Sequence, residues 1–312
     1  MKIVFLDRKS VGEDIDLQEF QEFGQVVTYD YSTKEEMIER VEDADVLILN
    51  KMLVNEETIG GAKNLKLVCV TATGTNNLDK EYLDSRGIAW RNVAGYSTET
   101  VAQHTFAMLF YLLENLPYYD DYVKSGSYVN DRMFTHFEKH FTEVKGKTWG
   151  IIGLGTIGRR VAELAKAFGC RVIYYSTSGQ NHNGDYEEVS FEDLLRQSDF
   201  VTIHAPLNEK TYHLMGWEAF EQMKETAILI NVGRGPIVVE EDLARALDQG
   251  QIAAAGLDVL DVEPMAEENP LRKVKDQNRL LITPHIGWAA TEARQRLMHM
   301  IAKKIRKFFF ES

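Results

Sequence analysis

Short runs of apolar residues alternate along the chain with longer segments in which apolar residues recur at helical spacing. In the first third of the chain, five such runs predict buried strands, at positions 3–6, 26–29, 46–49, 67–70 and 88–90. After the second run, Ser32 and Glu35 have the capping-box spacing that marks the start of a helix. Continuous apolar strands that alternate with helices are typical of a parallel sheet covered on both faces. The pattern therefore predicts a five-stranded, doubly wound domain.

A long helix and an irregular segment follow this domain. Apolar residues recur at helical spacing from Ser97 to Leu116, and we expect Pro117 to end the helix. Residues 118–147 show no clear period but are rich in Tyr, His and Phe. Long irregular segments in compact domains are usually functional. We therefore expect either a loop packed on the surface of the domain or an arm that reaches a second subunit.

The alternation of strands and helices starts again at Thr148. Six further runs predict strands, at positions 148–152, 171–175, 200–203, 227–231, 252–259 and 280–282. This arrangement suits a dinucleotide-binding domain, and a last helix at about 289–307 can cross back onto the first domain. We therefore predict an α/β protein with two doubly wound parallel-sheet domains. The first is discontinuous and consists of residues 1–97 plus 288–312, and the second consists of residues 98–287.

The run at 148–152 leads into the glycine-rich string GLGTIG at residues 153–158, and a helix follows. Gly153 would permit the tight turn, Gly155 would let the backbone approach a pyrophosphate, and Gly158 would allow close packing of helix on strand. The N-terminus of the helix would stabilise the phosphate charge. A tight turn without a ligand is the alternative, but the strand before the string and the helix after it favour a nucleotide.

The adenosine end of this site lacks the acidic residue that usually binds the ribose hydroxyls. Ser176 occupies that position, 18 residues after Gly158 (176 − 158 = 18). Without a carboxylate the 2′-phosphate of NADP is not repelled, yet no arginine beside Ser176 attracts it. We expect NAD, and the pattern leaves NADP open.

Charge and composition narrow the possible partners. The net charge of −13 argues against nucleic acid, and no apolar stretch reaches the roughly 18 residues that a membrane helix needs. The two cysteines, Cys69 and Cys170, fit reduced structural thiols, and we expect a cytoplasmic protein. His136 and His140 are four residues apart and would lie on the same side of a helix, but a metal site needs a third ligand. We therefore expect no metal.

Three segments that follow strands of the second domain carry chemically apt residues. They are NVGRGP with Arg234, GLDVLDVEP with the carboxylates Asp258, Asp261 and Glu263, and TPHIGW with His285. In open parallel sheets the ligand crevice lies outside the carboxyl ends of the strands, where all three segments would lie. Singly, each residue has a structural alternative: Arg234 could cap a turn, Glu263 could pair with a surface lysine, and His285 could be a strand-end histidine.

A histidine, an arginine and a carboxylate at one edge of a nicotinamide-binding sheet would suit the reduction of a keto acid. A histidine can give a proton to the emerging alkoxide in one direction and accept it in the other. An adjacent carboxylate, such as Glu263, would favour the protonated imidazole and fix its orientation. Arg234 could hydrogen-bond both the substrate carboxylate and the keto oxygen.

The strings GLGTIG, NVGRGPIV, GLDVLDVEP and TPHIGW, in this order, closely resemble the D-isomer-specific 2-hydroxyacid dehydrogenases, essentially from end to end. The resemblance implies a flavodoxin-like substrate domain, a Rossmann NAD(P)-binding domain, and Arg234, Glu263 and His285 as the catalytic trio. It also implies a homodimer, for which residues 118–147 would be the arm. The string TATGTNN at 71–77 resembles the substrate-carboxylate loop of the glycerate dehydrogenase (hydroxypyruvate reductase) branch.

This branch implies hydroxypyruvate or glyoxylate as the keto acid, with D-glycerate or glycolate as the product. The substrate would meet Thr73, Gly74, Arg234 and His285. Asp258 would accept a hydrogen bond from the nicotinamide carboxamide. The full set of residues expected to contact the cofactor is Gly153, Gly155, Thr156, Ile157, Gly158, Ser176, Thr177, His204, Ala205, Pro206, Thr211, Val232, Gly233, Arg234, Asp258, His285 and Gly287.

Other functions can be built on the same pattern of residues. A nicotinamide-sensing binding protein, similar to co-repressors that resemble this family, could keep every one of these residues. A D-lactate or other 2-keto acid reductase, or an oxidoreductase for formate or phosphite, would also use this fold. The TATGTNN string favours the small keto acids.

Overall fold

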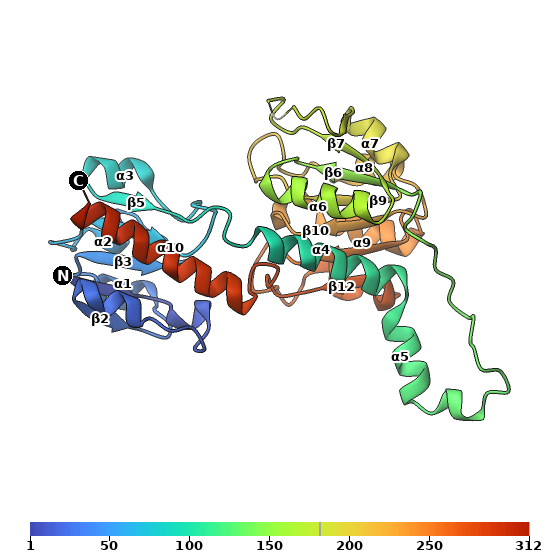
Figure 1. The fold of residues 1–312 in the computed structure, drawn as a ribbon, viewed down its shortest axis with the longest axis horizontal. Helices are drawn as coiled ribbons and strands as arrows, with labels where there is room; N and C mark the ends of the chain where they lie inside the picture. The colour runs from blue at the N-terminus through green and yellow to red at the C-terminus, as the bar shows by residue number, and fades with distance from the viewer. Residues whose placement is uncertain (181, 312) are drawn as a thin grey trace. The chain divides into compact units, whose positions relative to one another are not determined.

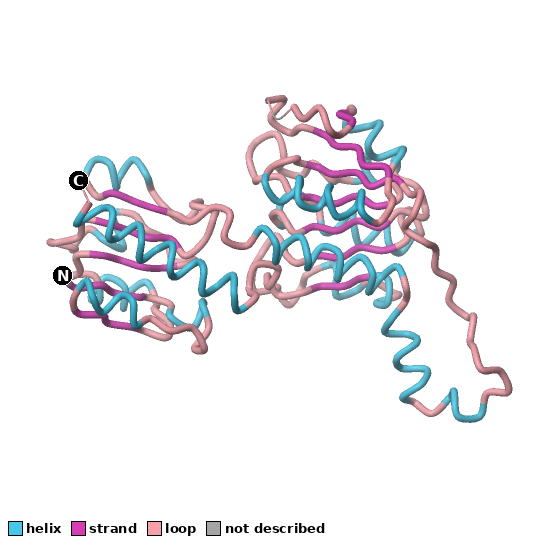
Figure 2. Tube along the Cα trace, in the orientation of Figure 1, coloured by secondary structure: helices cyan, strands magenta, loops and turns pink. Residues whose placement is uncertain are grey.

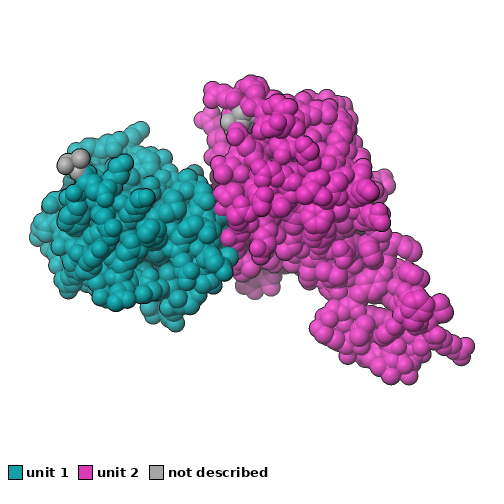
Figure 3. All heavy atoms as spheres, in the orientation of Figure 1, with its two compact units in different colours: residues 1–97, 288–312 teal, residues 98–287 magenta. Residues whose placement is uncertain are grey.

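The computed structural model describes residues 1–180 and 182–311. The chain forms two compact units, Met1–Ser97 with Trp288–Ser312 (unit 1) and Thr98–Gly287 (unit 2), which Figure 3 colours separately. Each unit contains its own parallel sheet and its own buried core. Within the described ranges, the helices are too short or too polar to span a lipid bilayer.

Unit 1 is a five-stranded parallel sheet in the order β2-β1-β3-β4-β5. This is the flavodoxin-like order, and it confirms the predicted fold class. The strands are β1 Lys2–Phe5, β2 Gln25–Thr28, β3 Val46–Leu49, β4 Leu67–Val70 and β5 Ala89–Arg91.

Helices cover both faces of this sheet because each helix has one apolar side. Helix α10 (Thr291–Phe310) buries Ala293, Leu297, Ile301 and Ile305, four residues apart each time, against one face. The opposite face is covered by the shorter helices α1 Lys34–Arg40, α2 Glu56–Ile59 and α3 Lys80–Ser85. Figure 1 shows α10 lying along the sheet of unit 1.

The capping box of α1 lies one residue later than predicted. Thr33, not Ser32, accepts from the backbone N–H of Glu36, and the Glu36 carboxylate accepts from the N–H of Thr33. The Ser32 hydroxyl instead donates to the carbonyl of Leu6 at the end of the sheet. Because that bond ties Ser32 to the sheet, the helix begins after Thr33.

Unit 2 is a seven-stranded parallel sheet in the order β12-β11-β10-β9-β6-β7-β8. Counted from β6, it contains the Rossmann order 3-2-1-4-5-6, with β12 added at one edge, as the predicted fold class requires. Its strands are β6 Thr148–Ile152, β7 Arg171–Tyr175, β8 Glu187–Glu188, β9 Phe200–Ile203, β10 Ile228–Asn231, β11 Ala254–Leu257 and β12 Leu280–Ile282. The apolar pattern missed β8 because both of its residues are exposed glutamates.

Two layers of helices bury the sheet of unit 2. Helices α4 (Thr98–Leu113) and α6 (Thr156–Ala167) pack on one face around the fully buried Trp149. The other face carries α7 Phe191–Gln197, α8 Trp217–Gln222 and α9 Glu240–Gln249.

The expected stop at Pro117 is wrong. Helix α4 ends at Leu113, Asn115 takes a left-handed conformation with φ of 53°, and a second helix, α5 (Leu116–Lys124), begins. Pro117 lies in the first turn of α5, where its missing N–H has no helical partner to lose. Helix α5 buries no residue in this chain. Figures 1 and 2 show α5 and the chain after it leaving the body of unit 2.

Candidate active site

The glycine-rich string forms the turn between β6 and α6. Gly153 has a φ of 92°, and a Cβ there would lie 2.8 Å from the backbone nitrogen of Ala205. A Cβ on Gly158 would lie 2.3 Å from the carbonyl oxygen of Gly153, so only glycine allows this helix to lie against this turn. Gly155, the N-cap of α6, has open space on its side-chain side. Thr156 and Ile157 begin the helix, and their backbone N–H groups have no partner within it.

Two buried polar atoms without a protein partner lie on either side of this turn. Ser176 follows β7, and His204 follows β9, the two strands that flank β6 in the sheet. Neither Ser176 Oγ nor His204 Nδ1 has a hydrogen-bond partner among the described residues. Since buried polar groups are almost always hydrogen-bonded, both atoms fit a bound nucleotide on this edge of the sheet.

The hydrogen on His204 can be placed from its neighbours. The indole N–H of Trp149 donates to Thr202 Oγ1 at 3.0 Å, and Thr202 Oγ1 lies 3.1 Å from His204 Nε2. The Thr202 hydroxyl can therefore give its own hydrogen to Nε2, which leaves a donor N–H at Nδ1. Burial lowers the pKa of His204 to about 3, so the ring is neutral and does not act as an acid near neutral pH.

The rest of the adenosine side is formed by the loops after β7 and β9. Thr177 is half-buried, Ala205 is buried beside Gly153, and Pro206 is exposed. Thr211 is fully buried, and its hydroxyl donates to the Pro206 carbonyl at 2.7 Å. Thr211 therefore shapes the loop instead of presenting its hydroxyl outward.

Arg234 lies in the turn after β10. The buried Asn231 holds this turn, because its Oδ1 accepts from the N–H of Gly233 and its Nδ2 donates to the Arg234 carbonyl, both at 3.0 Å. The Arg234 guanidinium donates to the Gly233 carbonyl at 2.7 Å. Val232 is half-buried beside them.

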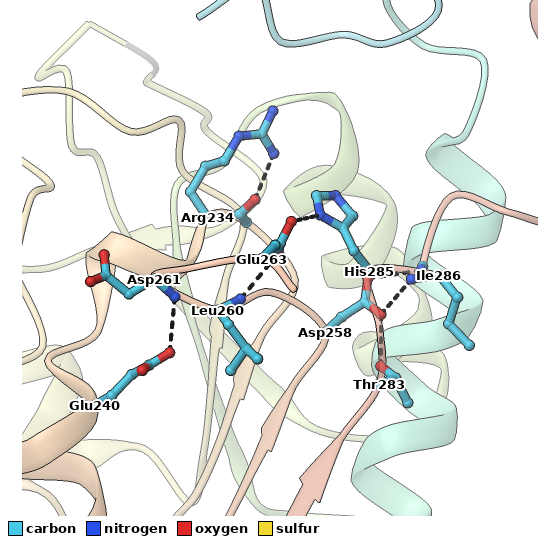
Figure 4. Close-up of polar contacts among 11 residues, drawn as sticks. Arg234, Glu240, Asp258, Leu260, Asp261, Glu263, Thr283, His285 and Ile286 are labelled. Atoms are coloured by element: carbon cyan, nitrogen blue, oxygen red, sulfur yellow. Dashed lines mark hydrogen bonds and ion pairs between the residues drawn. The ribbon is translucent and has the colours of Figure 1, made fainter. Parts of the chain in front are cut away.

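Glu263 and His285 are brought together from loops that follow neighbouring strands, β11 and β12. Glu263 Oε2 lies 2.8 Å from His285 Nδ1, while Oε1 accepts from the backbone N–H of Leu260 at 3.1 Å. The side chains are 30% and 25% exposed respectively, so the pair is open to solvent on one side. Figure 4 shows Arg234, Glu263 and His285 extending from three neighbouring loops toward the same side.

His285 is held in an unusual backbone conformation. Its φ of 55° lies in the left-handed region, which costs a non-glycine residue about 1–3 kcal/mol. Its N–H donates to the backbone carbonyls of Asp258 at 2.8 Å and Thr283 at 2.9 Å. The surrounding structure therefore imposes this conformation.

Asp258 anchors the rest of the same loop. Its Oδ1 accepts from the N–H of Ile286 and its Oδ2 from the N–H of Gly287, both at 2.8 Å. Burial by itself would raise the pKa of Asp258, but hydrogen bonds from His104, from Thr283 and from these two N–H groups together lower it. The carboxylate is therefore ionised and already engaged by the loop that carries His285.

His104 and Thr283 were missed by the sequence reasoning. They are 179 residues apart in sequence, and no local spacing links them. The available signal was a histidine inside the apolar helix α4, because such a residue usually has a buried partner.

The predicted substrate-carboxylate loop lies at the carboxyl edge of the sheet of unit 1. Thr73 Oγ1 donates to the Val93 carbonyl at 3.0 Å, and the Asn92 side chain donates to the Thr73 carbonyl at 2.5 Å. Asn77 Nδ2 donates to the carbonyls of Asn50 at 3.2 Å and Met52 at 2.9 Å. The loop with Thr73 and Gly74 is thus held from both sides. Among residues 1–180 and 182–311, no group of three His, Cys, Asp or Glu side chains is arranged for a metal ion.

Comparison with known proteins gives one consistent result. Residues 106–287 match the family described as D-isomer specific 2-hydroxyacid dehydrogenase, NAD binding domain. A hydroxypyruvate reductase from Blautia hydrogenotrophica is 34% identical over 316 residues, 99% of this chain and 97% of the relative. A glycerate dehydrogenase from Methylorubrum extorquens is 35% identical over 308 residues, 98% of this chain and 96% of the relative.

The solved structures agree with the sequence comparison. An acyclic imino acid reductase in complex with NADPH and D-Arg is similar with a TM-score of 0.87 at 28% identity, covering 99% of this chain and 97% of that one. The chain therefore belongs to the D-isomer specific 2-hydroxyacid dehydrogenases, and it is an NAD(P)-dependent oxidoreductase of D-2-hydroxy acids.

Proposed function

We propose that this protein reduces hydroxypyruvate or glyoxylate to D-glycerate or glycolate with NAD(P)H. The observation that carries the proposal is the 2.8 Å pair of Glu263 and His285 on the sheet edge that also holds Arg234. The choice of substrate is supported by the names of the two relatives, a hydroxypyruvate reductase and a glycerate dehydrogenase. We place the reaction in the cytoplasm, where the buried free thiols Cys69 and Cys170 stay reduced.

The loops at the carboxyl edge of the sheet of unit 2 would hold the cofactor. The turn from Gly153 to Gly158 suits the pyrophosphate, and the unpartnered atoms of Ser176 and His204 suit the adenosine half. Val232, Gly233, Asp258 and Gly287 would line the nicotinamide half. When bound, the reduced nicotinamide supplies the hydride.

The chain's own side chains would hold the keto acid and move the proton. Arg234 would bind the substrate carboxylate and polarise the keto oxygen, and the backbone N–H groups of Thr73 and Gly74 would bind the carboxylate as well. Because His285 Nδ1 faces Glu263, Nε2 is the atom that would give its proton to the developing alkoxide. Glu263 would keep the ring oriented and stabilise its charged form before the transfer.

We propose a modest preference for NADH over NADPH. Ser176 supplies no carboxylate to repel a 2′-phosphate, and its buried, unpartnered hydroxyl can hydrogen-bond to the ribose. The family description names an NAD binding domain, whereas the imino acid reductase was solved with NADPH. The ratio of kcat/KM for the two cofactors measures this preference directly.

We further propose that residues 118–147 form the dimerisation arm and that its occupant is a second copy of this chain. The apolar side chains that the arm exposes most are Val129 at 81%, Met133 at 59%, Phe134 at 88%, Phe137 at 72% and Phe141 at 58%. Such a set of exposed apolar residues usually marks a protein interface. Figure 3 shows the arm standing out from the body of unit 2, where one chain alone leaves it uncovered.

Light scattering after gel filtration tests the arm. We expect a mass about twice that of the chain, and the double variant Phe134→Ser with Phe137→Ser should shift it toward the monomer. Tyr31→Ser, a control at an aromatic residue that is 69% exposed in unit 1, should remain dimeric. A monomeric wild type, or a double variant that stays dimeric, would contradict the proposal.

The first test of the reaction is the initial rate of NADH and NADPH oxidation with a panel of keto acids. Hydroxypyruvate, glyoxylate, pyruvate and phenylpyruvate cover small, medium and bulky side chains. We expect the highest kcat/KM with hydroxypyruvate or glyoxylate, and a much higher value with phenylpyruvate would overturn the substrate assignment. Turnover only in the presence of an added amine would indicate imine reduction, the chemistry named for the structural neighbour.

A further inference from the structure

We propose that His104, on the first helix of unit 2, is a positioning residue that holds the loop of His285 in its active conformation. The inference rests on the proposed function of His285 and adds to it a residue that lies outside the reacting groups. It is carried by a chain of short contacts from α4 through Thr283 and Asp258 to the backbone of residues 285–287.

The loop needs an anchor because His285 is strained. Its φ of 55° is unfavourable for a side-chain-bearing residue, and three successive N–H groups fix it. The N–H of His285 donates to the Asp258 carbonyl, and those of Ile286 and Gly287 donate to the Asp258 carboxylate, all at 2.8 Å. Asp258 therefore determines the direction in which His285 faces Glu263.

His104 completes the surroundings of that carboxylate. The Thr283 hydroxyl donates to Asp258 Oδ1 at 2.6 Å, so its oxygen is free to accept from another donor. His104 Nε2 lies 3.0 Å from this oxygen and 3.3 Å from Asp258 Oδ1. This geometry places a hydrogen on Nε2 and directs it to the Thr283–Asp258 pair.

The packing around His104, Asp258 and Gly287 is tight. A Cβ on Gly287 would lie 2.7 Å from Asp258 Oδ2 and 3.4 Å from His104 Cδ2. Asp258 is 3% exposed and the His104 side chain 18%, so water compensates little for a lost donor. Removing the imidazole N–H weakens the anchor, and the strained loop can relax away from the Glu263 contact.

The test compares His104→Phe with His104→Gln in the full-length protein. Phenylalanine keeps a ring but has no donor, whereas the glutamine amide can donate near the position of Nε2. Because a misplaced reacting group slows catalysis strongly, we expect His104→Phe to lower kcat about 10- to 100-fold. KM for the keto acid should change less than about threefold, because Arg234, which would bind the substrate carboxylate, is untouched. His104→Gln should recover most of kcat.

Two controls separate positioning from general damage. His299→Gln removes an exposed histidine of α10 that contacts Glu19, and it should leave kcat unchanged. Thr283→Val removes the hydroxyl that bridges His104 and Asp258, and it should lower kcat as much as His104→Phe does. This second variant tests the same link if His104→Phe does not fold. Equal losses in His104→Phe and His104→Gln, or an unchanged kcat in both His104→Phe and Thr283→Val, would overturn the proposal.

Amide hydrogen exchange tests the role of His104 without any measurement of activity. The peptide that contains residues 283–287 should exchange its amides at least about tenfold faster in His104→Phe than in the wild type. His104→Gln and His299→Gln should keep the wild-type protection. If the wild type reduces no keto acid, the proposed function fails, yet faster exchange confined to this peptide would still support the anchor. Unchanged exchange in His104→Phe would refute the anchor even in an active enzyme.

Discussion

The carboxyl edges of the two sheets use the same device with different results. In unit 1, Asp7 follows β1 and accepts from the N–H groups of Asn50 and Lys51, in the loop after the neighbouring strand β3. In unit 2, Asp258 follows β11 and accepts from Ile286 and Gly287, in the loop after its neighbour β12. Each aspartate thus fixes two successive amides of the adjacent loop.

The two carboxylates differ in their further partners. Burial raises the pKa of Asp7, and the hydrogen bonds from the backbone of Asn50 and Lys51 and from Ser10 do not offset that effect. For Asp258, burial also acts to raise the pKa, but His104 and Thr283 add side-chain donors and the pKa falls. The comparison indicates that two backbone N–H groups suffice to shape the adjacent loop, whereas the lowered pKa of Asp258 needs the hydrogen bonds of His104 and Thr283 in addition. The unit 2 loop needs an ionised anchor because it holds His285 at a φ of 55°.

The largest effect on kcat should come from replacing His285, the proton donor that the unit 2 loop carries. The unit 1 loop has no such group. His285→Asn removes the proton donor at Nε2, and we expect kcat to fall about 10²- to 10⁴-fold, the usual contribution of general acid–base catalysis. NADH titration by fluorescence should give a Kd within about threefold of the wild type, because the phosphate turn is untouched. A variant that turns over at the wild-type rate would remove His285 from the mechanism.

The two anchors can be compared by the same substitution. Asp258→Asn places an amide N–H against Thr283, Ile286 or Gly287, all of which donate to this carboxylate. We expect the free energy of unfolding to fall by about 1–3 kcal/mol, measured by urea denaturation at pH 7. Asp7→Asn keeps one oxygen for its two N–H donors and should cost less than about 1 kcal/mol. A larger loss for Asp7→Asn than for Asp258→Asn would contradict the comparison.

The kinetic consequences of disturbing the two edges should also differ. Asn77→Ala in unit 1 removes the donors to the carbonyls of Asn50 and Met52 and loosens the proposed carboxylate loop. Because that loop would bind the substrate but would not move the proton, we expect KM for the keto acid to rise about three- to tenfold with little change in kcat. Steady-state kinetics at saturating NADH measure both constants. A fall in kcat at constant KM would assign the unit 1 edge to the chemical step instead.

The sequence predicted the motifs of these edges better than the contacts that support them. Strands such as β3 and β4 were visible because every residue in them is apolar and buried, and the glycine turn was visible because its backbone needs glycine. The sheet-edge pattern brought His285 near several carboxylates, and the family resemblance pointed to Glu263 among them. The link from His104 to Thr283 joins residues 179 apart, so no local spacing reveals it. Helix α5 was missed because Pro117, which lies in its first turn, was expected to end the helix before it.

The smallest effect that separates the two aspartates is the dependence of stability on pH. The lowered pKa of Asp258 means that its carboxylate stabilises the fold above the unfolded pKa of about 3.9, and this contribution is lost as the pH falls through the folded pKa. The contribution of Asp7 to the pH dependence of stability has the opposite sign. Its raised pKa means that the folded protein binds the proton more tightly, so its contribution is present in acid and is lost as the pH rises from about 3.9 through the folded pKa. Urea denaturation at several pH values between about 7 and 3 should therefore show a smaller acid loss of unfolding free energy in Asp258→Asn than in the wild type, and a larger loss in Asp7→Asn. Shifts of the same sign in both variants would mean that the side-chain donors His104 and Thr283 do not set the two anchors apart.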